Sequence, residues 1–65
     1  ITWRDLVQGA IEWFGGRASL NDIYSIIEDS VKARNNKHWR EKVRQTLQLH
    51  NNFKRIERGV WALAY

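Results

Sequence analysis

The sequence predicts a small α+β domain of three helices followed by a two-stranded β-hairpin, with a short extended segment between the first two helices. Apolar residues recur with a helical period in three stretches up to His50, whereas from Phe53 onward they alternate with polar residues as in strands. Breaker residues separate these stretches: Gly15-Gly16 and Asn51-Asn52 end two helices, and Arg58-Gly59 turns the hairpin.

The first helix is expected to run from Trp3 to the glycine pair, over about four turns. Thr2 is placed to cap it, and Asp5 completes a variant of the capping box. Gly9 costs stability in a helix interior, which predicts the close approach of a neighbouring element. The apolar face is expected to comprise Leu6, Ala10, Ile11, Trp13 and Phe14.

A second helix is expected after the extended link Arg17-Ala18-Ser19, with Ser19 as its cap and Asp22 three residues on. Tyr24 is expected to lie along its edge with the hydroxyl in water. The polar run from Lys32 to Asn36 is expected to form a loop. The buried stripe is expected to comprise Leu20, Ile23, Ile26, Ile27 and Val31.

The third helix is expected from Lys37 or Trp39 to His50, with either Asn36 or His38 as its cap. One face is assigned to the core on helical spacing, and its members are Trp39, Val43, Thr46, Leu47 and His50. The opposite face consists of Glu41, Gln45 and Gln48, flanked by Arg44 on one edge and by Lys42 and Leu49 on the other. Amide and guanidinium groups at adjacent turns are the side chains that pair with base edges in a DNA major groove.

The C-terminal stretch predicts a β-hairpin with strands from Phe53 to Glu57 and from Val60 to Tyr65. A lone hairpin is marginal in water, so its apolar face must pack on the helices. That face is expected to contain Phe53, Ile56, Trp61 and Leu63. Three helices and a hairpin, with the link before the second helix as a possible third strand, form the winged helix-turn-helix arrangement.

The length of 65 residues indicates one domain, residues 1–65. Because the chain starts at Ile1 without a methionine, we interpret it as a domain excised from a larger protein. Without an 18-residue apolar run or a signal segment, it is expected to be soluble, and no membrane partner is expected. The absence of cysteine excludes a disulfide framework and a thiolate zinc site.

Charge is divided unequally along the chain. Residues 1–31 carry two cations against five anions, whereas residues 32–65 carry nine cations against two anions. The net charges are therefore −3 and +7. A strongly positive half in a small domain is typical of nucleic-acid binding, although a solvated charged face is the alternative.

The candidate DNA-binding residues fall into two groups. Cations of the hairpin can reach phosphates or the minor groove, although for Lys54 charged protection of a strand edge is an equal interpretation. The hairpin group is Lys54, Arg55 and Arg58. The recognition-helix group is Lys37, His38, Trp39, Arg40, Glu41, Arg44, Gln45 and Gln48.

Three of these residues have more specific expectations. Trp39 shares the core face of its helix, yet it is also the large apolar group nearest the helix entrance, so a core role and a base-contacting role both stay open. His38 is expected to contact a phosphate or to cap the helix. Glu41 is expected to accept from a cytosine amino group or to orient Arg40 or Arg44, because an anion near phosphates is otherwise costly.

No catalytic or metal site is expected. His38 and His50 have no cysteine or carboxylate at zinc-ligand spacing, no nucleophile is placed by a motif, and no glycine-rich phosphate loop follows a strand. The fragment is therefore predicted to be no enzyme and to need no cofactor. A nuclease activity of its own would require acidic metal ligands, which the basic half lacks.

Several motifs of the chain resemble one known family. They are Asn36-x-His38, Lys42-Val43-Arg44-Gln45-x-Leu47-Gln48, Glu57-Arg58-Gly59-Val60-Trp61 and, more weakly, Ser19-Leu20-x-Asp22-Ile23-Tyr24. With these residues the chain resembles the C-terminal winged-helix domain of DpnI-type restriction endonucleases, which depend on adenine methylation. A cap, a histidine, two cations and two glutamines in fixed spacing are more specific than a generic helix-turn-helix.

The resemblance implies sequence-specific binding of double-stranded DNA and reading of N6-methyladenine in a GATC-like context through the major groove. It also implies a type II or type IV restriction endonuclease as the parent protein, with a nuclease domain in the same chain, in the cytoplasm of a prokaryote. Two alternatives are a DNA binder indifferent to methylation and a protein-interaction module with an apolar patch around Trp3 and Trp13.

Overall fold

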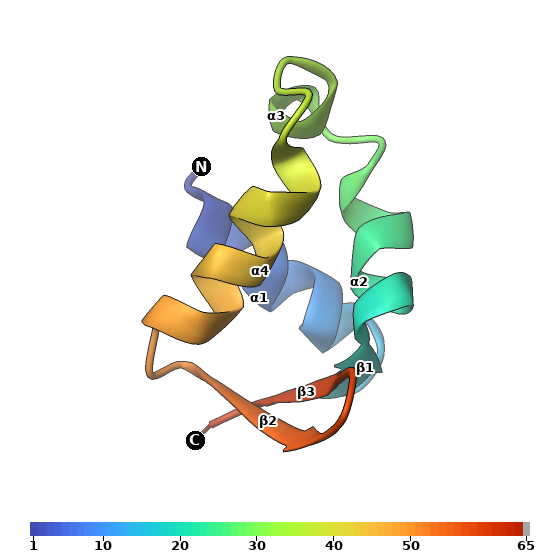
Figure 1. The fold of residues 1–65 in the computed structure, drawn as a ribbon. Coiled ribbons are helices and arrows are strands. Elements are labelled where there is room, and N and C mark those ends of the chain that lie inside the picture. Colours follow the sequence, from blue (N-terminus) through green and yellow to red (C-terminus); the bar gives the residue numbers. More distant parts are fainter. Residues whose placement is uncertain (65) are drawn as a thin grey trace.

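The computed structural model describes residues 1–64 and has the expected α+β winged-helix architecture, with helices above a small antiparallel sheet (Figure 1). Among residues 1–64, every helix is too short or too polar to span a lipid bilayer. In chain order the elements are α1 (Trp3–Trp13), β1 (Arg17–Ser19), α2 (Leu20–Ile27), α3 (Val31–Arg34), α4 (Trp39–Leu49), β2 (Phe53–Glu57) and β3 (Val60–Leu63).

The start of α1 is the predicted capping box. The Thr2 hydroxyl accepts from the Asp5 backbone N–H at 3.1 Å, and the Asp5 carboxylate accepts from the Thr2 backbone N–H at 3.0 Å. The helix ends at Trp13, earlier than expected, and the chain then turns through Gly15 and Gly16, whose φ angles are 85° and 104°. These left-handed conformations favour glycine, which confirms the predicted stop.

The buried face of α1 differs from the predicted one. Val7 and Ile11 are fully buried, whereas Trp13 is 76% exposed, so the assignment of Trp13 to the core is wrong. Two residues beyond Ile11, Trp13 lies about 200° further round the helix and points away from the core. Phe14 is also exposed, at 39%. The expected close approach at Gly9 is wrong too, because no atom lies within 4 Å of where its Cβ would stand.

The cap of α2 is confirmed, since Ser19 Oγ accepts from the Asp22 backbone N–H at 3.1 Å. Two members of its predicted stripe lie outside the core. Ile26 is 39% exposed and Val31 is 70% exposed. Because α2 ends at Ile27 and the chain turns before Val31, the stripe does not continue into the next element.

A short helix, α3, occupies much of the stretch predicted to be a loop. Its cap is Ser30, whose hydroxyl accepts from the Ala33 backbone N–H at 3.2 Å. Ala33 is buried, and the Lys32 ammonium lies 5.6 Å from the centre of the Trp3 ring on α1. The loop prediction failed here because a single helical turn shows no apolar period.

Helix α4 crosses α1 and presents its predicted inner face to the core (Figure 1). Trp39, Val43, Thr46 and Leu47 are buried there, and His50 is half-buried. Beyond Leu49 the chain becomes extended at His50, with φ −99° and ψ 135°. A left-handed stop at Asn51-Asn52 is therefore wrong, since within residues 1–64 only glycines have positive φ.

The sheet has the order β1-β3-β2, and every neighbouring pair is antiparallel. Arg17–Ser19 thus pairs as the third strand, with Ala18 opposite Trp61. The pairing of β2 with β3 skips Ile56, which marks a bulge. Phe53 is in the core cluster, whereas Ile56 is half-buried and lies outside that cluster. Strand β3 ends at Leu63, and the expected strand end at Tyr65 lies outside the described residues.

The capping box predicts a pH dependence of stability. The pKa of Asp5 is lowered from its ordinary value, chiefly because the carboxylate accepts a hydrogen bond from the Thr2 backbone. A lowered folded pKa adds stability above the unfolded pKa, and this stability is lost as the pH falls through the folded pKa. The free energy of unfolding of the wild type should therefore exceed that of Asp5→Ala at neutral pH, with a difference that shrinks on acidification.

Urea unfolding of both proteins across this pH range, with an NMR titration of the Asp5 carboxyl, measures the effect. Asp29→Ala, which removes an exposed carboxylate in the turn after α2, is the control. A wild-type advantage over Asp5→Ala that stays constant with pH would contradict the assignment.

Candidate nucleic-acid interface

The outer face of α4 carries the candidate recognition residues into solvent. It is exposed because the opposite face is fixed in the core by Val43, at 0% exposure, and Leu47, at 1%. All the predicted residues on and before this helix except Trp39 are exposed, namely Lys37, His38, Arg40, Glu41, Arg44, Gln45 and Gln48. Amides and cations from successive turns thus share one accessible surface.

Trp39 belongs to the core. It is 8% exposed, and its ring meets that of Tyr24 on α2 edge to face, with 5.5 Å between centroids and an interplanar angle of 84°. The guanidinium carbon of Arg40 lies 4.5 Å from the centre of the Trp39 ring, at cation–π distance. Of the two expected roles of Trp39, the structure shows the packing role.

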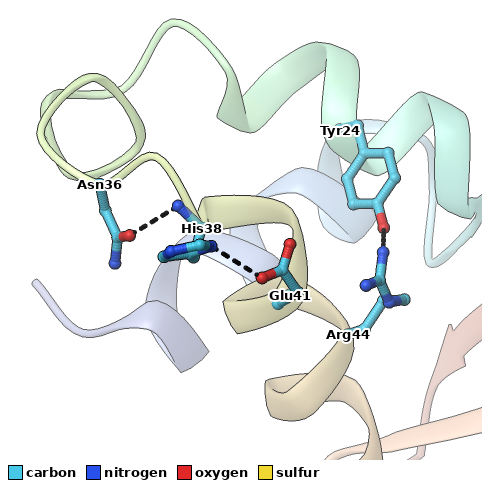
Figure 2. Close-up of polar contacts among 5 residues, drawn as sticks. All are labelled: Tyr24, Asn36, His38, Glu41 and Arg44. Atoms are coloured by element: carbon cyan, nitrogen blue, oxygen red, sulfur yellow. Dashed lines mark hydrogen bonds and ion pairs between the residues drawn. The ribbon is translucent and has the colours of Figure 1, made fainter.

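The entrance to α4 is organised by side chains that face one another (Figure 2). The Asn36 side-chain oxygen accepts from the His38 backbone N–H at 2.8 Å, and His38 occupies the cap position without a side-chain cap bond. Instead, its ring Nδ1 lies 3.0 Å from a carboxylate oxygen of Glu41. The expectation that Glu41 orients Arg40 or Arg44 is therefore wrong, because its partner is His38.

The side chain of Arg44 is fixed by a hydrogen bond to a residue of α2. Its Nη1 donates to the Tyr24 hydroxyl at 2.9 Å, and the two side chains point toward each other across the space between α2 and α4 (Figure 2). Tyr24 lies half-buried at the edge of α2, as expected, and this exposed bond to Arg44 is a contact that the expectation did not include. Sequence reasoning missed the contact because the two residues are 20 apart. The position of Tyr24 beside the buried stripe of α2 was the available signal.

The recognition helix and the wing, which is the hairpin of β2 and β3, border a common pocket of about 150 Å³. Arg44 and Gln48 contribute from α4, and Arg55 contributes from β2. The remaining lining residues are Leu20, Leu47, Gly59 and Trp61. Lys54 and Arg58, the other predicted wing cations, are exposed on β2 and on the turn. The structure thus brings Arg44 and Gln48 of the helix group beside Arg55 of the hairpin group.

A second hollow, of about 320 Å³, lies on the other edge of α4, against the start of α1. Arg4 lines it together with Lys42, Gln45 and His50. Charge counting along the sequence missed Arg4, because it belongs to the half with a net charge of −3. Folding nevertheless places it beside the cations of the positive half, so the basic surface continues past α4.

The chain matches the family described as "Forkhead domain" over residues 1–63. The match includes every helix and strand of the described structure. A comparison with curated proteins found no match.

The burial of Trp39 generates a stability prediction. Trp39→Ala should lower the free energy of unfolding by about 3 to 5 kcal/mol, because a large side chain leaves the core. A domain of this size has little more than about 3 to 5 kcal/mol in total, so the variant should be largely unfolded without ligand.

The control is Gln45→Ala, on the outer face of the same helix, which should stay within about 0.5 kcal/mol of the wild type. Urea unfolding followed by circular dichroism gives both values. Equal stability of the two variants would show that Trp39 is not a core residue.

Proposed function

The chain belongs to the forkhead family of winged-helix domains, which bind double-stranded DNA sequence-specifically and are not enzymes, and from this premise we propose how it reads DNA. The outer face of α4 enters the major groove and contacts base edges. The wing and the start of α4 hold the phosphate backbone on either side.

The observation that carries this proposal is the division of α4 into two faces. Val43 and Leu47 are locked in the core, so Arg44, Gln45 and Gln48 face outward at adjacent turns. Arginine suits the O6 and N7 acceptors of guanine, and glutamine suits N6 and N7 of adenine. We assign base readout to these three side chains.

Affinity is assigned to the cations around this face. Lys37, His38 and Arg40 stand at the start of α4, where free backbone N–H groups and the helix dipole favour a phosphate. Arg55 and Arg58 stand on the wing. The net charge of +7 over residues 32–65 supports strong electrostatic attraction and therefore a marked dependence on salt.

A finer candidate function is the reading of N6-methyladenine. The pocket between α4 and the wing supports it, because half-buried apolar walls from Leu20 and Trp61 lie beside Arg44 and Gln48. An adenine N6-methyl group projects into the major groove, where such walls could contact it. Because Trp39 is in the core, we assign the aromatic contact with the methyl group to Trp61. The resemblance to DpnI-type domains adds the proposal that the parent chain carries a nuclease domain.

Selection from a duplex library, followed by titrations at stated salt, tests base readout. Arg44→Ala should weaken binding to the selected site by about 1 to 3 kcal/mol and relax one base position. Lys54→Ala, the matched control on the wing, should weaken binding to all sequences alike and lower the salt slope by about one. If both variants behaved alike, readout by α4 would be wrong. A wild type whose binding ignored salt would contradict DNA binding itself.

Titrations of GATC duplexes with two, one or no methylated adenines test the finer function. Binding should be tightest to the methylated duplexes, and Trp61→Ala should reduce this preference. Equal affinity of the wild type for all three duplexes would overturn methyl reading while leaving sequence-specific binding intact.

A further inference from the structure

We propose that Tyr24 of α2 is a positioning residue for base recognition: its hydroxyl fixes the guanidinium of Arg44 in the orientation that reads a base. The inference rests on the proposed function of the outer face of α4. It extends the recognition surface to a residue of another helix that need not touch a base.

The contact is distinctive within the described part of the chain. The 2.9 Å bond from Arg44 Nη1 to the Tyr24 hydroxyl joins α4 to α2 directly (Figure 2). The other side-chain hydrogen bonds among residues 1–64 all join partners at most four residues apart. The bond between Tyr24 and Arg44 is thus a side-chain link between α2 and α4, whereas the other bonds are local.

The Tyr24 hydroxyl is itself firmly placed. The phenol ring is half-buried and packs edge to face against Trp39, at 5.5 Å between centroids. Trp39 is 8% exposed, so the core determines where this ring lies. A tyrosine has few rotatable bonds, which makes its hydroxyl a stable acceptor at the edge of α4.

Arginine gains most from such an anchor, because its long side chain loses considerable rotamer freedom when it binds. Arg44 is exposed and would otherwise sample many orientations. Because the bond to Tyr24 already restricts the Arg44 side chain in the free protein, less rotamer entropy is lost on binding. A duplex whose base fits this fixed orientation is therefore favoured. The bond uses one N–H of Nη1, so the remaining donors of the guanidinium stay free for a base.

The test uses Tyr24→Phe, which keeps the ring against Trp39 and removes only the hydroxyl. Affinities are measured for the selected duplex and for a duplex altered at the base pair that Arg44→Ala relaxes. Binding to the selected duplex should weaken about three- to tenfold, the cost of immobilising one long side chain on binding. Binding to the altered duplex should be unchanged, so that specificity falls. In the Arg44→Ala background, Tyr24→Phe should have no further effect.

Ser25→Ala is the matched control, because it removes an exposed α2 hydroxyl that bonds within its own helix, to the Asp22 carbonyl at 2.6 Å. It should leave both affinities unchanged. Thermal unfolding of each variant shows that the fold is retained.

Several results would overturn the proposal. Tighter binding by Tyr24→Phe would mean that the hydroxyl holds Arg44 away from DNA. Equal weakening on both duplexes would indicate a phosphate contact, and wild-type affinities would leave the hydroxyl without a role. If Arg44→Ala relaxed specificity while Tyr24→Phe did not, only the role of Tyr24 would fail. If the wild type itself showed no sequence preference, the proposed function would fail and the role of Tyr24 with it.

Discussion

The burial of one face of α4 is the constraint on which the rest of this domain depends. Val43 and Leu47 have essentially no exposed surface, and they share the core cluster with Ile11 of α1 and Ile23 of α2. A helix has two sides, so fixing one in the core determines which side chains the other presents. The surface assigned to DNA reading is therefore a direct consequence of how the core is packed.

The sheet extends this arrangement to the wing. Strand β3 lies between β1 and β2, so the hairpin is tied to the segment that leads directly into α2. The Leu20 backbone N–H also donates to the carbonyl of Gly59 in the hairpin turn, at 2.8 Å. Because the start of α2 and the wing are joined in this way, Arg55 stands at a defined place beside Arg44 and Gln48. Helix and wing can then act as one surface.

Local signals in the sequence predicted the local structure well. The Thr2–Asp5 box, the Ser19 cap and the face of Val43 and Leu47 each depend on residues within a few positions, and the structure confirms them. The assignment of Trp13 to the core is wrong because it lies about 200° round α1 from the buried Ile11, so one narrow face cannot hold both. The bond between Tyr24 and Arg44, like the position of Arg4 beside Lys42, arises from contacts between elements far apart in sequence. No spacing rule reports such contacts.

The most direct test of the account is to follow the backbone amide NMR signals of the domain while a selected DNA duplex is added. If α4 reads the groove and the wing holds the backbone, the largest shifts will come from Arg44, Gln45 and Gln48 and from the turn at Arg58. The signals of Glu12 and Asp29, which lie outside the assigned surface, will change little. Largest shifts around Trp13, with α4 unaffected, would contradict the account and indicate a different binding face.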